Sequence, residues 1–307
     1  MKFNNSSVGE SLRLFTSAVQ LWLDRNAFEH AAALAFYTLF SLAPLMIMLV
    51  AVVGIVFGEE AARGEISAAI GDLVGTRAAA AVEGAVERSQ LTEAGLLPSL
   101  LGVGTMLFGA TTVFAQMQGS LNHFWGVQAR PARSGLVVFI TVRLLSLSMV
   151  LIVGFLLLIS FVVSIAISGA IAFARDWIPV PAAIVSLLDV AISVGVTTLL
   201  VGMIFKVLPD VRLQWHDVWH GALVTAILFA FGKYFISLYL TRVAPDSTYG
   251  AAGSLVVVLM WVYYSSLILF FGTSLAAARI MRRDGAVTPK KTAVRARVVI
   301  QEDESAG

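Results

Sequence analysis

Residues 144–174 read LLSLSMVLIVGFLLLISFVVSIAISGAIAFA and contain neither a charged residue nor a proline. About 20 apolar residues in a helix are enough to cross the hydrocarbon core of a bilayer. A helix over the whole stretch is longer than this, so it must tilt, bend or protrude. Strands are not expected, because the strands of membrane barrels alternate apolar and polar residues. The stretch therefore predicts an all-α membrane protein.

The rest of the 307-residue chain has the same character. Hydrophobic residues make up 58% of it, charged residues only 13%, and the mean hydropathy is +0.87. Soluble domains contain about a quarter charged residues, so this chain cannot cover itself with polar surface. The absence of cysteine excludes disulfides and thiolate metal sites. We predict a bundle of six transmembrane helices over residues 31–279, with spans at about 31–57, 97–118, 138–172, 183–206, 218–241 and 250–278.

The charges indicate how this bundle is oriented. Lys and Arg are concentrated at both termini and in the connections after the second and fourth spans. The positive-inside rule places that side of the membrane in the cytoplasm. Both termini are therefore expected to be cytoplasmic.

Three further segments flank or connect the spans. Residues 1–30 carry apolar residues at helical spacing between Leu12 and Trp22, which predicts an amphipathic helix on the membrane surface or packed under the bundle. The outer loop, 58–93, predicts one or two short helices that cap the outer face or cover a pathway. Residues 280–307 show little apolar periodicity, which predicts a disordered cytoplasmic tail whose basic part can lie on anionic lipid.

Two ionisable side chains lie deep inside the predicted spans, Asp189 and Lys233. A charge in hydrocarbon is costly, so such residues usually face a partner, a cavity or a pathway. Counted along their spans, both lie roughly 9–12 Å below the outer surface. Either they form an intramembrane ion pair, or Lys233 reaches outward while Asp189 bonds to a nearby serine or to water.

Other residues are assigned to helix packing. Pro44 removes a hydrogen bond in the middle of the first span and should bend the helix or act as a hinge. Gly250 opens the sixth span, where small residues let helices approach closely. Small side chains form a similar stripe in the third span, at Ser160, Ser164 and Ser168.

Signatures of catalysis are sparse. The sequence has no phosphate-binding glycine loop, no Rossmann fingerprint and no nucleophile elbow. His216 and His220 have the spacing of a zinc pair, but Asp217 stands where a zinc protease needs glutamate, and no third ligand is obvious. Beside Trp215 and Trp219, the two histidines are better explained as interfacial residues. We expect no enzyme activity, no metal, no cofactor and no nucleic-acid partner.

Short motifs occur in order along the chain: Ala32–Pro44 (AALAFYTLFSLAP), Ser120–Trp125 (SLNHFW), Leu208–Asp210 (LPD), Gly232–Lys233 with Tyr239, Tyr249–Gly250 and Trp261–Tyr263 (WVY). With this order and spacing, the region from about Ala31 to Arg279 resembles the YihY/BrkB family of bacterial inner-membrane proteins, once labelled ribonuclease BN. The resemblance implies six transmembrane helices, a cytoplasmic N-terminus and no securely established reaction. It also implies a connection with serum resistance, and hence virulence, and with the movement of envelope lipids.

The chain departs from the family pattern in two spans. Family members often carry glutamate where this chain has Ala230 and Ser274. A proton or ion role built on those acids does not carry over. Asp189 is expected to supply the acid for Lys233 instead.

We therefore expect transport or handling of lipids or other anionic envelope components through a polar groove formed by Lys233, Asp189, Tyr37 and Asn122. The alternative is a structural protein that organises the envelope without transport, and the least favoured interpretation is a ribonuclease. Membrane lipids are the expected partners, with a homo-oligomer or envelope proteins as further candidates.

Overall fold

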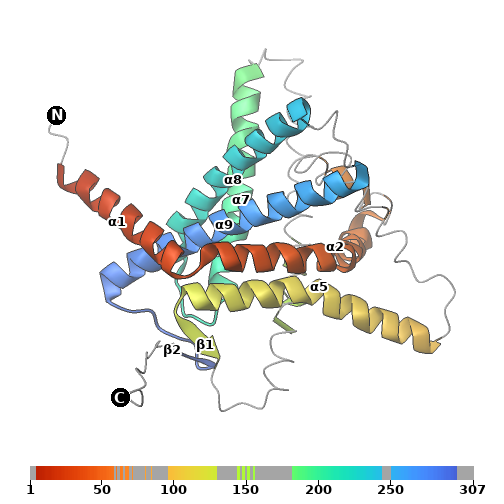
Figure 1. Ribbon diagram of the computed structural model, residues 1–307, viewed down its shortest axis with the longest axis horizontal. Helices are drawn as coiled ribbons and strands as arrows, with labels where there is room; N and C mark the ends of the chain where they lie inside the picture. Colours follow the sequence, from red (N-terminus) through yellow and green to blue (C-terminus); the bar gives the residue numbers. More distant parts are fainter. Residues whose placement is uncertain are drawn as a thin grey trace, which may run out of the picture.

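The computed structural model describes residues 5–58, 96–129, 182–243 and 250–295, together with isolated positions between 60 and 84 and between 144 and 155. These parts are mostly helical (Figure 1). The long helices are α1 (Asn5–Asp24), α2 (Ala27–Phe57), α5 (Leu96–Phe124), α7 (Ala182–Val207), α8 (Trp215–Val243) and α9 (Gly250–Asp284). Two short strands are also present, β1 (Val127–Ala129) and β2 (Ala293–Arg295).

Five of the predicted spans correspond to described helices, namely α2, α5, α7, α8 and α9, with ends within six residues of those predicted. Among the described residues, three helices are long and apolar enough to cross a membrane, at Val190–Val207, Trp215–Phe235 and Leu255–Asp284, and Ala27–Leu42 is a shorter apolar helix. The predicted third span with its three serines lies outside the described residues, apart from isolated positions, and so does most of the outer loop. The count of six spans therefore stays a prediction.

The helices pack in a continuous series. Helix α2 lies beside α5 and also contacts α9, α9 contacts α8, and α8 contacts α7 (Figure 1). Helix α1 packs mainly on α9, and the chain turns from α1 into α2 at Asn26, which has a left-handed backbone (φ 51°, ψ 48°). Asparagine tolerates this conformation better than most residues, so it suits the corner.

One side of α1 is occupied by α9. The rings of Phe15 and Trp22 meet Phe271 edge-on, with centroids 5.8 and 6.4 Å away. The indole N–H of Trp22 donates to the carbonyl oxygen of Leu267 at 3.0 Å. Leu12 remains 65% exposed. The helix therefore packs on the bundle, and contact of its remaining apolar surface with a membrane stays a prediction.

Glycines set the close approach of α8 and α9. A Cβ atom on Gly272 would overlap Thr225 Oγ1 and lie 2.8 Å from the carbonyl oxygen of Gly221. Farther along α8, a Cβ atom on Gly232 would overlap the ring of Tyr264. No larger residue fits at these two crossings without moving a helix backbone or a ring.

Helix α2 continues through Pro44. A Cβ atom built on Gly109 of α5 would lie 2.8 Å from Pro44 Cγ, so the proline ring fills the space that this glycine leaves. Gly250 is the first residue of α9, as predicted for the start of the sixth span.

The C-terminal segment is more ordered than the sequence predicts. Helix α9 runs to Asp284, the chain turns at Gly285 (φ 73°), and β2 pairs antiparallel with β1, with Gln128 opposite Val294. Val287 packs into the core. The prediction of disorder from residue 280 is wrong for residues 280–295, because main-chain pairing over three residues leaves no periodic apolar pattern to detect. Residues 296–307 lie outside the described residues.

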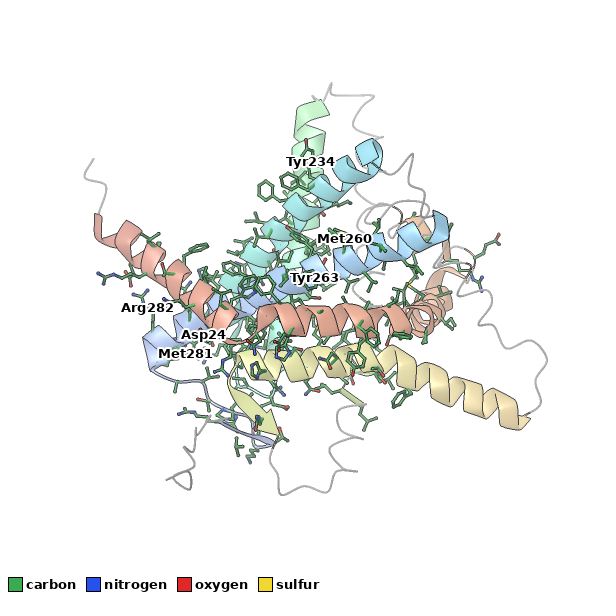
Figure 2. The ribbon with its side chains drawn as sticks, viewed as in Figure 1. Asp24, Tyr234, Met260, Tyr263, Met281 and Arg282 are labelled. Atoms are coloured by element: carbon green, nitrogen blue, oxygen red, sulfur yellow. The ribbon has the colours of Figure 1, made fainter. Side chains whose placement is uncertain are left out.

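The largest buried side chains gather where several helices end. Phe124 and Phe270 stack with ring centroids 4.8 Å apart, and Trp125 and Phe205 are buried with them. We call this end of the bundle the basal face; it is formed by residues 25–30, 118–129, 207–217 and 279–295. Away from it, large side chains such as Tyr234 and Met260 are exposed on the outside of the helices (Figure 2). This pattern suits helices surrounded by lipid.

Candidate polar site at the basal face

A reciprocal contact between Asn122 and Asp210 connects α5 to the linker between α7 and α8. The Asp210 backbone N–H donates to Asn122 Oδ1 at 2.7 Å, and Asn122 Nδ2 donates to Asp210 Oδ2 at 3.0 Å. Gln118 Nε2, one turn earlier on α5, donates to the same carboxylate oxygen at 3.3 Å. Thr292 Oγ1 donates to the other oxygen at 3.2 Å. Asp210 therefore joins three segments that are far apart in the sequence.

Lys290 fastens the C-terminal segment to the end of α7. Its Nζ donates at 3.1 Å to the carbonyl oxygen of Val207, the last residue of α7, which has no partner within the helix. It also donates at 2.6 Å to the carbonyl oxygen of Pro209 in the linker. Its backbone N–H donates to the carbonyl oxygen of Asp210 at 2.9 Å. Burial lowers the pKa of Lys290, and the charge of Asp210 partly opposes that shift. Residues 285–295 thus hold the linker in place.

A cavity of about 390 Å³ lies beside this junction. It is lined by residues from the corner between α1 and α2, from α2, α5 and β1, and from the linker: Arg25, His30, Ala115, Gln118, Gly119, Asn122, His123, Val127, Gln128 and Asp210. The α5 residues recur every three or four positions, so one face of that helix forms a wall. The volume is at the small end of the range for ligand pockets, about 300–1,000 Å³.

Two histidine rings lie close together in this cavity, inclined to each other at 33°. The rings of His30 and His123 have centroids 4.7 Å apart, and His30 Nδ1 is 3.0 Å from Ser120 Oγ. Among the residues that the structure describes, neither ring nitrogen of His123 has a hydrogen-bond partner. Burial, the neighbouring His30 and the charge of Arg25 all lower the pKa of His123. His123 is therefore mainly neutral at pH 7. Its one ring N–H can donate a hydrogen bond to an anion bound in the cavity.

Arg25 brings a permanent positive charge to the same cavity. It lies at the corner between α1 and α2, and its guanidinium packs over Gly126, whose φ of 65° favours glycine. A Cβ atom on Gly126 would lie 3.2 Å from Arg25 Nη2. Within the described part of the chain, the guanidinium has neither an ion-pair partner nor a hydrogen-bond acceptor. An anionic ligand could supply both.

The predicted site residues occupy different parts of the molecule. Asn122 lies at the basal face, bonded to Asp210. Tyr37 is 39% exposed on α2, two turns and roughly 10 Å beyond His30. Lys233 is exposed on α8, eighteen residues and roughly 27 Å beyond the basal start of that helix. The structure does not bring Lys233 and Asn122 together.

Asp189 lies on α7, but its side chain is outside the described residues, so pairing with Lys233 stays a prediction. Lys233 itself does make contacts in the structure.

The second polar cluster of the basal face has a structural role. The Gln214 backbone N–H donates to Asp217 Oδ2 at 2.8 Å, which is one half of a helix capping box at the start of α8. Arg283 Nη1 and His216 Nε2 each lie 2.9 Å from Asp217 Oδ1. The described residues contain no group of three side chains that could hold a metal ion, and His216 faces Asp217.

Arg25, Gln118, His30 and His123 were not singled out as site residues from the sequence. One signal was available: the motifs Ser120–Trp125 and Leu208–Asp210 both stood out from the sequence, and the structure joins them through Asn122 and Asp210. Nothing in a single sequence says that these two motifs meet.

Residues 18–297 match the family described as virulence factor BrkB. A UPF0761 membrane protein of Pseudoalteromonas translucida (strain TAC 125) is 26% identical over 262 residues, which cover 83% of this chain and 82% of that protein. A UPF0761 membrane protein of Pseudomonas paraeruginosa is 26% identical over 82% of this chain and 60% of its own length.

A third relative, a UPF0761 membrane protein of Ralstonia nicotianae, is 29% identical over 64% of this chain and 41% of its own length. The chain thus spans three-fifths or less of the latter two relatives. No solved structure matches the chain.

Proposed function

This chain belongs to the virulence factor BrkB family and is an integral membrane protein, and from that premise we propose that it binds anionic envelope components, lipids among them, and moves them through the membrane. The basal face lies in the cytoplasm, and the basal cavity receives the anionic group. The protein acts by binding and positioning, without a chemical reaction.

The observation that carries this proposal is the Arg25 guanidinium in the cavity. It has no acidic partner among the described residues, although Asp210 lines the same cavity. Guanidinium matches the geometry of phosphate oxygens and binds them with paired hydrogen bonds. The ring nitrogens of His123 add further hydrogen-bonding capacity at the same place. Together they favour a phosphate or a similar anion.

The surface of α2 supports a ligand that also has an apolar part. Tyr37 lies seven residues after His30, so the two residues share one side of the helix. Nearby, Phe36 and Phe40 are exposed, with ring centroids 4.8 Å apart. A lipid headgroup in the cavity can therefore leave its acyl chains along an apolar helix surface.

Lys233 is the second anion-binding position of the proposed pathway. It lies in the half of α8 that is remote from the basal face. Two cationic positions at different depths suit movement of an anion from one leaflet to the other. Asp189 is proposed to balance the charge of Lys233 when no anion is bound.

Lipid retention tests this proposal. The wild type and the Arg25→Gln and Arg212→Gln variants are purified in mild detergent, and bound lipids are quantified by mass spectrometry. Arg212 is the matched control, because it is an exposed basic residue of the basal face that does not line the cavity. We expect selective retention of phosphate-bearing lipid in the wild type and in Arg212→Gln, with at least a fivefold loss in Arg25→Gln.

Equal retention of phosphate-bearing lipid in all three proteins would show that Arg25 does not bind it. No selective retention in any of them would contradict lipid handling and favour a structural role in the envelope.

A further inference from the structure

Two titratable rings meet at the wall of the basal cavity. The ring centroids of His30, on α2, and His123, on α5, are 4.7 Å apart, and both residues line the cavity. Both lie outside the predicted spans at 31–57 and 97–118. His30 Nδ1 lies 3.0 Å from Ser120 Oγ, and within the described part of the chain its Nε2 has no hydrogen-bond partner. Together with both nitrogens of His123, three of the four ring nitrogens are therefore available to a proton or a ligand.

Burial and nearby charges favour the neutral form of this pair. Burial lowers the pKa of both histidines. The neighbouring ring and Arg25 lower the pKa of His123 further, whereas Glu29 partly opposes the shift at His30. Among the described residues that line the cavity, Asp210 is the only acid, and both of its carboxylate oxygens already accept hydrogen bonds from the protein. At pH 7 the pair is therefore mainly neutral.

An anion in the cavity reverses this balance. Pairing with the Arg25 guanidinium cancels the charge that disfavours a proton on His123, and a negative charge within about 4–6 Å favours the imidazolium directly. A protonated ring has two N–H donors in place of one, so it can also donate a further hydrogen bond to the anion. Protonation of both rings is disfavoured, because two imidazolium groups would repel each other. The pair therefore takes up about one proton, which belongs to both members together.

We propose that the His30–His123 pair is a proton-binding site coupled to the anion site, so that a phosphodiester or a similar anion binds in the basal cavity together with a proton. The inference rests on the proposed function and adds the proton as a second ligand of the same site. Because the bound anion raises the pKa of the pair, the affinity for the anion rises as the pH falls through the interval between the lower and the higher pKa. Loss of the proton weakens the binding of the anion by the same factor, which favours its release.

Calorimetry measures the proton uptake directly. Glycerophosphoglycerol is titrated into the detergent-purified full chain at pH 6.5, in two buffers that differ in ionisation enthalpy. The charge of this phosphodiester does not change between pH 5.5 and pH 7.5, so any proton taken up is bound by the protein. We expect an uptake of about 0.3–1 proton per anion bound. Repeated titrations should give an affinity at least fivefold higher at pH 5.5 than at pH 7.5.

Substitutions locate the proton. A double variant, His30→Gln with His123→Gln, retains hydrogen-bond donors but cannot be protonated, so it should lose the proton uptake and show less than a twofold change in affinity between the two pH values. His220→Gln is the matched control, because His220 is an exposed histidine near the basal start of α8 that does not line the cavity. It should retain both properties. Thermal unfolding at each pH verifies that the variants are folded. If the double variant does not fold or bind, the proton uptake of the wild type still decides.

A further arm separates a lipid headgroup from a soluble phosphodiester. The protein is placed in nanodiscs of phosphatidylglycerol or of an uncharged galactolipid, and glycerophosphoglycerol is titrated into each in 0.3 M salt, which screens the surface charge of the discs. Weaker binding in the phosphatidylglycerol discs indicates that lipid headgroups occupy the cavity, and equal affinity indicates a soluble ligand. Wherever the diester binds, proton uptake should accompany it.

Binding by the wild type without proton uptake, and with the same affinity at both pH values, would overturn the inference. Undiminished uptake in the double variant, or no binding of the diester at any pH, would overturn it as well. In each case the proposed function survives if Arg25-dependent retention of phosphate-bearing lipid is still observed. Loss of that retention, by contrast, removes the proposed function too.

Discussion

Asn122 makes the contact on which the basal site depends most. Its amide bonds both to the backbone N–H and to the carboxylate of Asp210. Asn122→Leu removes both hydrogen bonds and leaves Asp210 with fewer donors, so it should lower the free energy of unfolding by about 2–3 kcal/mol. Thermal and denaturant unfolding of the purified protein measures this. Gln128→Leu is the control, because Gln128 lines the cavity at an exposed position; a similar loss there would contradict the assignment.

His123 gives the stability of the protein a predictable pH dependence. Burial, His30 and Arg25 hold its pKa below the usual 6.5 in the folded protein. When the pH falls below about 6.5, the unfolded chain binds more protons at this position than the folded protein does, so the free energy of unfolding decreases. Above that pH His123 is neutral in both the folded and the unfolded chain, so its protonation no longer lowers the free energy of unfolding.

We expect His123→Gln to lose less stability than the wild type between pH 7.5 and pH 5.5, in thermal melts without ligand. Identical pH profiles for the two proteins would contradict a lowered pKa at this position.

At this scale, the sequence identified Asn122 but not its role. Asp210 follows it by 88 residues, and the hydrogen bonds between them exist only once α5 and the linker have been packed. Arg25 and His30 lie beside a predicted span and carry no pattern of their own. Their grouping depends on where helices end in space, which a one-dimensional pattern does not record.

At the scale of elements, the contact of α8 with α9 depends on Gly272. A methyl group at this position would overlap Thr225 Oγ1, whose rotation would break its hydrogen bond to the Gly221 carbonyl, and would crowd that backbone carbonyl, which cannot move without shifting helix α8. Gly272→Ala should therefore cost about 1–3 kcal/mol of stability.

Gly195→Ala on α7 is the matched control, because nothing lies within 4 Å of the added Cβ atom. It should be neutral or stabilising by up to about 1 kcal/mol, since alanine favours helix more than glycine does. A smaller loss for Gly272→Ala than for Gly195→Ala in thermal unfolding would contradict the packing of α8 on α9.

Helix positions could be predicted well, because long apolar runs bounded by polar residues identify α2, α7, α8 and α9 directly. The strands β1 and β2 could not, because each contains only three residues and is held by main-chain hydrogen bonds. The same reason explains why the order of residues 285–295 was missed. Short segments that are fixed by backbone contacts leave little signal in side-chain patterns.

At the scale of the whole molecule, the basal face contains the helix ends that should share one side of the membrane if successive spans cross it in opposite directions. Helices α5 and α7 end there, as the bonds from Asn122 to Asp210 and from Lys290 to Val207 show. Helix α9 ends and α8 begins where Arg283 pairs with Asp217, and α2 begins at the cavity that His30 lines. This agrees with the direction predicted for each of the five described helices that correspond to a predicted span. Its place in the cytoplasm is a separate prediction that rests on the distribution of Lys and Arg.

Labelling of single cysteines tests this topology, because the chain has no cysteine of its own. Gln128→Cys and Arg212→Cys should react with a membrane-impermeant maleimide only after the cells are lysed. Glu60→Cys, just beyond the far end of α2, and Arg175→Cys, between predicted spans three and four, should react on intact spheroplasts. Reaction of Arg175→Cys from the cytoplasmic side would contradict the predicted third span.

If an anionic envelope component occupies the basal cavity, a large side chain that fills the cavity should displace it. Gly119 lines the cavity and Gly104 does not, yet both lie on α5 with open space at the position of a Cβ atom. Bound phosphate-bearing lipid is quantified by mass spectrometry in wild type, Gly119→Phe and Gly104→Phe of equal thermal stability. We expect at least a fivefold loss of bound lipid in Gly119→Phe and wild-type retention in Gly104→Phe. Equal retention in both variants would contradict it.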